Sequence, residues 1–212
     1  MKNLKHLFII LFFFLLADRA FCDQFISVKT VIDGDTIVLE NNITVRYIGI
    51  NAPEVETKEK QQEPFGQEAQ AFNRTLVLSG KIRLEQDIEK DDQFGRRLAY
   101  VYLTNGLFAN QEILKKGLAY VLYHPPNIKY SGLLLNAQQQ AMAEKKGMWN
   151  NLREAPQDYI GNKNSMRFHL MSCASAQSTS KKNQVVLKKK WDAFWQGYAP
   201  CKKCLGQAKW ME

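Results

Sequence analysis

Residues 25–48 read FISVKTVIDGDTIVLENNITVRYI, and this stretch decides the fold of the 212-residue chain. Apolar and β-branched residues alternate with polar ones in three runs, which predicts three half-buried strands. The runs are residues 25–32, 36–39 and 43–48. Short connections rich in Asp, Gly and Asn separate them, and these residues favour tight hairpin turns. The stretch therefore predicts the beginning of an antiparallel sheet.

The rest of the first 150 residues alternates between helical and strand patterns. Further strands are expected around Ile82–Leu84 and Leu98–Tyr102, and helices around residues 65–79, 110–116 and 131–146, each followed by glycine. The polar stretch 55–64 is predicted to be a mobile loop. Strands, an inserted helix, more strands and two final helices indicate an α+β domain. Five strands with a capping helix suggest a closed OB-fold β-barrel, the oligonucleotide/oligosaccharide-binding architecture.

The N-terminus predicts a secretory signal peptide. Lys2 and Lys5 precede an apolar run from residue 7 to residue 17, and Ala20-Phe21-Cys22 offers a cleavage site. The run is shorter than the roughly 20 apolar residues that a membrane span needs. We therefore expect cleavage near Cys22 and export to the medium or the periplasm. A lipid-modified Cys22 and an uncleaved membrane anchor are the alternatives.

Charge is distributed unevenly along the chain. The whole sequence carries +8, and loss of residues 1–22 removes three basic residues and one acidic residue, which leaves +6. Residues 161–212 hold ten Lys and Arg against two acids, whereas residues 23–160 hold sixteen against eighteen. A basic tail of this kind indicates a polyanionic partner, nucleic acid before anionic membrane. A merely solubilising tail is the alternative.

Two carboxylates flank a glycine in Asp33-Gly34-Asp35, at the end of the first strand. The pair fits a simple turn, because Asp-Gly is a common hairpin signal. It also fits a cation site, because Asp oxygens are ligands that Ca²⁺ and Mg²⁺ prefer. The surrounding residues favour the second interpretation.

Charged residues recur inside or just beyond the predicted strands. Arg46 lies in an apolar strand and needs a partner there, Glu54 follows that strand, and Arg96 precedes a later one. Each alone fits an ordinary ion pair. Together with the two aspartates they match the needs of phosphodiester hydrolysis: a cation, a carboxylate that activates water, and guanidinium groups that hold the phosphate. His124 is the only histidine between residue 23 and the tail, so a carboxylate base is expected.

Motifs occur in a fixed order along residues 25–150. They are Ile-Asp-Gly-Asp-Thr (32–36), Arg-x-x-Gly-Ile-x-x-Pro-Glu (46–54), Phe-Gly-Arg-x-Leu-Ala-Tyr-Val-Tyr (94–102), Lys-Gly-Leu-Ala-Tyr-Val (116–121) and Lys-Lys-Gly-Met-Trp (145–149). This order resembles the staphylococcal nuclease (thermonuclease) family. The resemblance implies a five-stranded barrel with three helices and a calcium-dependent endonuclease that cleaves DNA and RNA by water attack on phosphorus. It implies no stable protein partner, so we expect a monomer that meets the membrane only through its signal peptide.

The resemblance also implies a role for each matching position. Asp35, Asn51 and the carbonyl of Ala52 would hold Ca²⁺, with Asp33 at the edge of the metal through water. Glu54 would be the general base or would orient the water. Arg46 and Arg96 would bind the phosphate and stabilise the transition state.

Two departures from the best-known member of that family stand out. Asn51 occupies a position where aspartate is familiar, so we expect weaker calcium binding but not its loss, because an amide oxygen still coordinates Ca²⁺. Gln93 and Phe94 replace a lysine and a tyrosine in a nucleotide-contact turn, which would lose a phosphate contact but keep stacking. Tyr123 matches a further aromatic near the bound base, with simple packing against Pro125 as the alternative.

The tail carries a second set of metal-ligand residues. His169-x₃-Cys173 and Cys201-x₂-Cys204 have ligand spacing, and four such groups suit tetrahedral Zn²⁺. A disulfide with one free thiol is the alternative. The segment resembles the small metal-binding module of Ada-type DNA repair proteins, with His in place of a first Cys. So short a segment is expected to have little core, which would make its fold depend on metal. Its aromatic residues, Trp191, Phe194, Trp195 and Trp210, either form that core or contact nucleic acid beside Lys188–Lys190.

The sequence therefore predicts three parts: a signal peptide (1–22), an OB-fold nuclease domain (23–155) and a basic tail with a zinc module (156–212). The predicted function is an exported calcium-dependent endonuclease whose tail aids nucleic-acid binding. A catalytically silent nucleic-acid-binding barrel is the alternative, although such a barrel usually loses the acids and arginines that are present here. An envelope protein whose tail binds anionic lipid is a third, weaker hypothesis.

Overall fold

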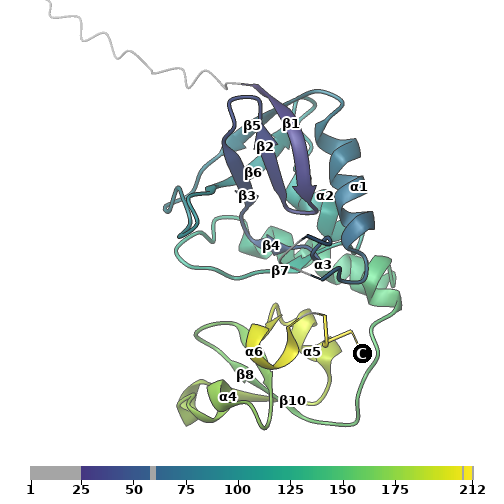
Figure 1. Cartoon of the computed structure of the whole chain (residues 1–212). Helices are drawn as coiled ribbons and strands as arrows, with labels where there is room; N and C mark the ends of the chain where they lie inside the picture. The colour runs from purple at the N-terminus through teal and green to yellow at the C-terminus, as the bar shows by residue number, and fades with distance from the viewer. Residues whose placement is uncertain (1–24, 58–60, 207, 212) are drawn as a thin grey trace, which may run out of the picture.

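The structure is a computed structural model that describes residues 25–57, 61–206 and 208–211. The predicted signal peptide lies outside these residues, as does part of the predicted loop 55–64. Among the residues described, no helix is both long and apolar enough to cross a membrane. Figure 1 shows a barrel with flanking helices and, below it, a smaller unit built from the C-terminal quarter of the chain.

A closed barrel of five strands forms the larger unit, in the order β1-β2-β3-β6-β5. Its strands are β1 (Ile26–Asp33), β2 (Thr36–Leu39), β3 (Thr44–Tyr47), β5 (Lys81–Glu85) and β6 (Arg97–Leu103). Neighbouring strands are antiparallel except β3 and β6, which run parallel with Arg46 opposite Leu98. Each strand contributes buried residues to the interior, among them Ile37, Val45 and Ile82. The predicted OB-fold barrel is thus confirmed.

Three helices cover the barrel: α1 (Gly66–Val77), α2 (Ala109–Lys115) and α3 (Ser131–Ala143). Gly117 and Gly147 follow α2 and α3 closely with φ values of 69° and 52°. The positive φ of Gly117, which glycine adopts without steric cost, ends the path of α2, whereas α3 has already ended before Gly147, where Lys145 has a φ of 52°. The helices end one to three residues before the predicted limits.

A second, two-residue pairing joins β4 (Ile50–Asn51) to β7 (Tyr120–Val121) at one end of the barrel. The sequence did not predict this pair, because two residues are too few to show a period of two. The pairing brings residue 51 beside residue 120, which become neighbours in the site described below.

The C-terminal unit contains a four-stranded sheet in the order β10-β8-β9-β11. Its strands are β8 (Tyr159–Asn162), β9 (Arg167–Leu170), β10 (Gln184–Leu187) and β11 (Ala199–Pro200). The short helices α4 (Ala174–Gln177), α5 (Lys190–Trp195) and α6 (Lys202–Leu205) pack on it, and a 3₁₀ turn occupies Lys181–Asn183. A second 3₁₀ turn, Gly147–Asn150, follows α3 in the larger unit. The sequence predicted neither this sheet nor its helices.

The two units share one hydrophobic cluster. Tyr120 and Trp149 of the larger unit pack against Phe194, with ring centroids 5.7 and 5.0 Å away, and Trp210 lies 5.6 Å from Tyr120. In α3 the Gln138 side chain accepts a hydrogen bond from the Val121 N–H and donates one to the Phe194 carbonyl. The expectation that the tail would have little core is therefore wrong, because eleven of the sixteen buried residues of this cluster come from the tail and the barrel unit adds the other five. Of the four tail aromatics, Phe194 and Trp210 are buried, whereas 40% of Trp195 is exposed.

Candidate active site and metal centre

The Asp33-Gly34-Asp35 turn connects β1 to β2, with Asp33 opposite Thr36. The turn interpretation is thus confirmed, and the geometry also explains the glycine. A Cβ on Gly34 would lie 2.6 Å from the Cβ atoms of both Ala52 and Ala69, so only glycine allows the turn to touch α1 and the segment after β4. The Asp35 N–H donates to Asp33 Oδ1 at 2.9 Å, which holds the two carboxylates on the same turn.

Asp35 and Arg46 form a nearly buried ion pair. Asp35 Oδ2 lies 3.1 Å from Arg46 Nη2 and accepts the Ala52 N–H at 2.6 Å. The side chains of Asp35 and Arg46 are only 5% and 11% exposed. The strand arginine therefore has the acidic partner that it needed. Because Asp35 also contacts residue 52, the pair joins the turn to the chain beyond β4.

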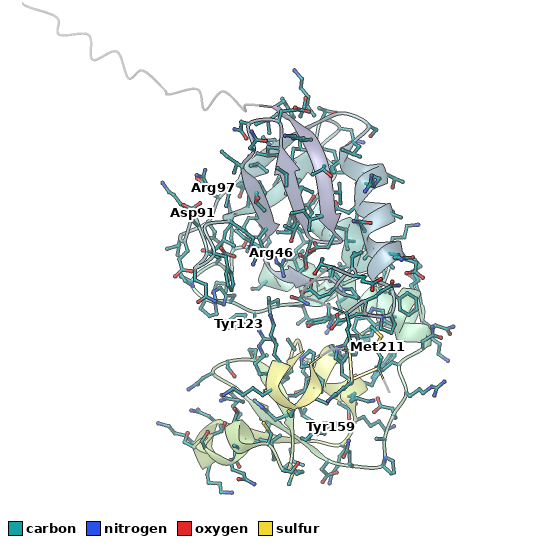
Figure 2. All side chains as sticks on the ribbon, viewed as in Figure 1. Arg46, Asp91, Arg97, Tyr123, Tyr159 and Met211 are labelled. Atoms are coloured by element: carbon teal, nitrogen blue, oxygen red, sulfur yellow. The ribbon has the colours of Figure 1, made fainter. Side chains whose placement is uncertain are left out.

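The Arg46 guanidinium is held from several sides. Nη1 donates to the carbonyls of Tyr47 and Ile50, both at 2.9 Å, and Nη2 donates to Asn51 Oδ1 at 3.0 Å. Asp35 accepts from the second Nη2 hydrogen, so among the described residues the contacts of Arg46 use Nη1 and Nη2 and leave the Nε hydrogen over. Figure 2 labels Arg46 at the end of the barrel that carries β4 and β7.

Asn51 occupies the centre of this arrangement. Its Nδ2 donates to the Ala52 carbonyl at 3.2 Å and to the Tyr120 hydroxyl at 3.0 Å. The structure therefore brings Asp35, Asn51 and the Ala52 carbonyl together, as predicted. Tyr120 was missed, because 69 residues separate it from Asn51. The Lys-Gly-Leu-Ala-Tyr-Val motif was the one signal that could have identified it.

The oxygen atoms at this place form a donor set that suits a hard cation. Two carboxylates, an amide and a main-chain carbonyl lie within one hairpin and the segment that contacts it, and Ca²⁺ binds such oxygen ligands with water completing the shell. Burial and the neighbouring Asp35 charge raise the pKa of Asp33 to about 7. The Asp35 charge thus disfavours ionisation of Asp33, and a dication beside the two carboxylates reverses that effect. The residues present thus fit calcium.

Glu54 is fixed by its main chain. The Glu54 N–H donates to Glu63 Oε2 at 3.0 Å, and the Glu54 carbonyl accepts the Glu63 N–H at 2.9 Å. Gly66 packs so closely that a Cβ there would lie 2.2 Å from the Glu54 carbonyl oxygen. Glu63 and Gly66 therefore determine where Glu54 lies. Neither residue was predicted as part of the site, because Glu63 lies within the stretch 55–64 that was expected to be mobile and Gly66 follows it closely.

Arg96 is presented by its own turn. Its Nε and Nη2 bind Asp92 Oδ2 at 2.8 and 2.7 Å, and its guanidinium carbon lies 5.5 Å from the centre of the Phe94 ring. Burial alone would raise the pKa of Asp92, but hydrogen bonds from Arg96 and Phe94 outweigh it and lower that pKa. Asp92 therefore stays ionised and orients Arg96. No contact in the described chain joins Arg96 to Arg46.

The predicted substrate contacts lie at the surface of the barrel unit. Gln93 is exposed and Phe94 is 73% exposed, so the ring has a free face for stacking. Tyr123 is half-buried just after β7, and Figure 2 places it at the edge of the barrel that faces the C-terminal unit. Arg97, which follows Arg96 in the sequence, pairs with Asp91, and Figure 2 labels both on the left side of the barrel.

A cleft of about 430 Å³ lies between the two units. Asn51, Glu54, Glu63 and Tyr120 line it from the barrel side. The opposite wall comes from the C-terminal unit, and its lining includes Lys202, Lys203, Lys209 and Trp210. This arrangement was not predicted, because no local sequence pattern indicates where an appended segment will dock.

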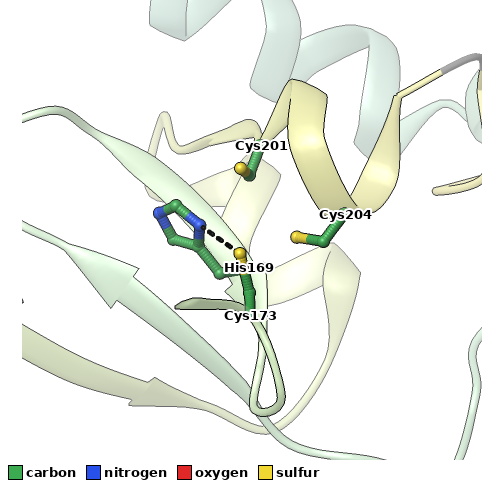
Figure 3. A group of neighbouring side chains, drawn as sticks. All are labelled: His169, Cys173, Cys201 and Cys204. Carbon is green, nitrogen blue, oxygen red and sulfur yellow. Dashed lines mark hydrogen bonds between the residues drawn. The ribbon is translucent and has the colours of Figure 1, made fainter. Parts of the chain in front are cut away.

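The four predicted tail ligands converge in the C-terminal unit (Figure 3). The ligand atoms of His169, Cys173, Cys201 and Cys204 all lie within 4.8 Å of one another, and Cys173 Sγ is 3.6 Å from His169 Nδ1. Tetrahedral Zn²⁺ with bonds of about 2.3 Å to sulfur places its ligands about 3.8 Å apart, so the cluster has the right size. The three cysteines form no disulfide with one another in this structure.

The protonation states of the cluster also suit a metal. Burial lowers the pKa of His169, which keeps the imidazole neutral, and burial raises the pKa of the Cys204 thiol to about 12. Neutral imidazole is the form that binds metal, and a coordinating cation deprotonates a thiol outright. The cluster is thus a candidate zinc site. It stands apart from the Asp35 site, since α6 carries Lys202 and Lys203 between the two.

Comparisons of this chain with protein families and with individual proteins both identify nucleases. The model of the staphylococcal nuclease homologue family matches residues 44–151, which include Arg46, Asn51, Glu54 and Arg96. The chain is 38% identical to the thermonuclease of Staphylococcus hyicus over 132 residues, covering 61% of this chain and 78% of the relative. The same identity holds over 125 residues for the thermonuclease of Staphylococcus intermedius, covering 58% and 74% of the two chains. Endonuclease YncB of Bacillus subtilis is also 38% identical, over 130 residues that cover 59% and 61%. With the barrel, the motifs and these relatives in agreement, the chain belongs to the staphylococcal nuclease family.

Proposed function

We propose that this protein is an exported, calcium-dependent endonuclease that hydrolyses phosphodiester bonds of DNA and RNA. One observation carries the proposal: Asp35, Arg46, Asn51 and the Ala52 carbonyl are in direct contact at one end of the barrel, beside a cleft that Glu54 lines. Oxygen ligands, a carboxylate and a guanidinium at one cleft match the requirements of hydrolysis at phosphorus. The retained acids and arginines argue against a silent binding module.

Asp35, Asn51 and the Ala52 carbonyl would hold the calcium ion, with Asp33 reaching it through water. When bound, the ion polarises a phosphate oxygen. Asn51 would need its amide oxygen turned toward the ion, which exchanges its contact with Arg46 for one with the metal. The missing charge at position 51 is expected to weaken calcium binding.

Glu54 would take a proton from the attacking water, since the Glu63 contacts hold its main chain at the cleft wall. Arg46 would exchange its bond to Asp35 for the phosphate once Asp35 serves as a cation ligand. Arg96, oriented by Asp92, would be the second guanidinium on the phosphate. Charge that develops on the phosphoryl oxygens is best stabilised by donors fixed in advance, and both arginines are fixed. Phe94 and Tyr123 would stack on bases, and Gln93 would contact the strand without a charge.

The His169, Cys173, Cys201 and Cys204 cluster would hold a structural Zn²⁺. Four protein ligands leave no open position, which is typical of structural and not catalytic zinc. The basic tail would aid substrate binding by attraction to phosphate. Its expected benefit is therefore in affinity and not in the chemical step.

The deciding experiment digests single-stranded DNA, duplex DNA and RNA with purified residues 23–212. Cleavage is expected with Ca²⁺, and it is expected to stop with EGTA and to return on adding Ca²⁺ but not Zn²⁺. Full-rate cleavage in the chelator would contradict the mechanism. Export has its own test: N-terminal sequencing of protein recovered outside the cytoplasm should begin at Asp23, whereas a retained N-terminus would contradict cleavage.

A further inference from the structure

The two sides of the cleft carry opposite charge. Glu54 and Glu63 line the barrel side, and Lys202, Lys203 and Lys209 line the side that belongs to the C-terminal unit. All three lysine side chains are exposed. The cleft therefore has an acidic wall, where the proposed chemistry takes place, and a basic wall opposite.

The basic wall is built on the metal-ligand turn. Lys202 and Lys203 stand between Cys201 and Cys204, so the sequence Cys-Lys-Lys-Cys sends its cysteines to the cluster and its lysines to the cleft. The Leu205 N–H donates to the Cys201 carbonyl at 2.8 Å, which closes the turn. Next to it, Trp210 is 3% exposed and packs on Tyr120, which fixes the adjacent Lys209. These lysines are therefore held in place by packed residues and not by a loose tail.

The charge of this wall is available to a ligand. Neither the Lys203 nor the Lys209 amine makes an ion pair or hydrogen bond with any part of the chain that the structure describes. By contrast, Lys188 on the same unit pairs with Asp158 at 2.7 Å. Two lysine amines without a carboxylate, opposite the proposed general base, suit the phosphates of a substrate.

The dimensions limit what enters. About 430 Å³ is within the range of pockets that enclose a small ligand, roughly 300–1,000 Å³. A short length of one strand with an unstacked base fits such a space. A duplex does not, because its major groove alone is about 12 Å wide.

We propose that Lys203 and Lys209 of the C-terminal unit form a phosphate-binding wall that draws a single nucleic-acid strand across Glu54. The inference deepens the proposed nuclease function and rests on it. The C-terminal unit is then part of the substrate site itself. It selects single strands because the cleft between the units is closed on two sides.

The test compares two double variants with equal loss of charge. K203A/K209A removes the wall, and K181A/K182A removes two exposed lysines of the same unit that do not line the cleft. Binding of a fluorescent 12-nucleotide single strand and of the matching duplex is measured by anisotropy across a salt series. All proteins carry Glu54→Gln so that the strand stays intact. Circular dichroism checks that each variant is folded.

K203A/K209A is expected to weaken single-strand binding about tenfold at low salt and to reduce the slope of log K against log salt by about 1.4, since each single-strand phosphate contact contributes about 0.7. K181A/K182A is expected to change the single-strand affinity and the salt slope by far less. Equal losses of single-strand affinity in the two double variants would overturn the proposal. So would a parent protein, with all four lysines present, that binds the duplex as tightly as the single strand.

Cleavage by the same lysine variants with Glu54 restored separates this inference from the function on which it rests. An inactive parent protein that still binds through Lys203 and Lys209 would contradict the nuclease proposal alone. An active parent whose KM for the strand is unchanged by K203A/K209A would contradict the wall alone. A K203A/K209A variant that cleaves faster than its parent would also overturn the inference, because the unit would then obstruct the cleft.

Discussion

Asn51 is the residue on which the character of the site depends. As an amide it donates to Ala52 and Tyr120 and accepts from Arg46, so it satisfies its neighbours without any ion. An aspartate there could accept but not donate, and its charge would face the Ala52 carbonyl. The chain thus has a site that is well hydrogen-bonded without metal, at the expected cost of calcium affinity.

Asn51→Asp is expected to reverse that balance. The variant should melt at a lower temperature than the parent in EGTA, because it loses two hydrogen-bond donations in a partly buried place. It should bind Ca²⁺ about tenfold more tightly or better, because a full charge is added next to a dication. Thermal melts with and without calcium and a calcium titration measure both effects. A variant whose melting temperature responds to calcium no more than the parent's would contradict the placement of residue 51 at the metal.

Glu54→Gln tests the base. The amide keeps the size of the side chain but cannot accept the proton, so turnover should fall about 100-fold or more while the fold is kept. Glu68→Gln, an exposed change in the first turn of α1, is the matched control and should leave turnover within a factor of two. Initial rates on single-stranded DNA decide the matter, and equal rates for both variants would remove Glu54 from the mechanism.

Arg96→Ala tests whether the second guanidinium stabilises the transition state, with Arg97→Ala as the control. Loss of a donor aimed at developing charge costs about 100-fold to 1,000-fold in turnover, whereas Arg97→Ala should cost little because Arg97 pairs with the exposed Asp91. Steady-state kinetics should show the Arg96 effect in kcat. If both substitutions act alike, Arg96 has no special role.

At the scale of elements, the β1–β2 hairpin carries the largest share of the site. It is clamped by α1, where the buried Asn73 donates to the Asp33 carbonyl at 3.0 Å and accepts the Tyr47 hydroxyl at 3.0 Å. Gly34 makes this clamp possible, since its lack of a side chain lets the turn touch Ala52 and Ala69.

Gly34→Ala should therefore destabilise the protein and also impair it. A Cβ 2.6 Å from two other Cβ atoms forces the hairpin away from α1, and such overpacking costs about 2 kcal/mol. The displacement also carries Asp33 and Asp35 out of place, so calcium binding should weaken. Gly132→Ala, where a Cβ meets nothing within 4 Å, is the control. Urea unfolding and calcium titration of both variants check the effect, and a Gly34 variant as stable as the control would contradict this account.

The same hairpin shows which parts of the fold could be predicted from the sequence. β2 was predicted with its observed limits, because alternating β-branched residues between two turn signals leave little freedom. β4, β7 and the C-terminal sheet were not predicted, since strands of two residues and of irregular pattern have no period to detect. In the site, residues within one motif, such as Arg46 and Asn51, were found together as predicted. Tyr120, Asn73 and Lys209 were missed, because tertiary packing alone brings them there.

On the scale of the whole molecule, the His/Cys cluster is expected to bind about one zinc per chain. Cys204→Ser should lose the metal and lower the melting temperature by about 5–10 °C, since structural zinc contributes folding energy. Ser172→Ala, an exposed change beside the cluster, should do neither. Elemental analysis and thermal melts measure these quantities. A metal-free protein with a Cys201–Cys204 disulfide would decide for the alternative.

The shared aromatic cluster has a consequence for the order in which the two units are completed. Tyr120 and Trp149 are synthesised more than forty residues before Phe194, against which they pack. A barrel that folds before the C-terminal unit therefore exposes this hydrophobic surface, and its cleft has only one wall. The cleft gains its second wall only when the C-terminal unit packs on the barrel, so the substrate site is completed after the barrel itself.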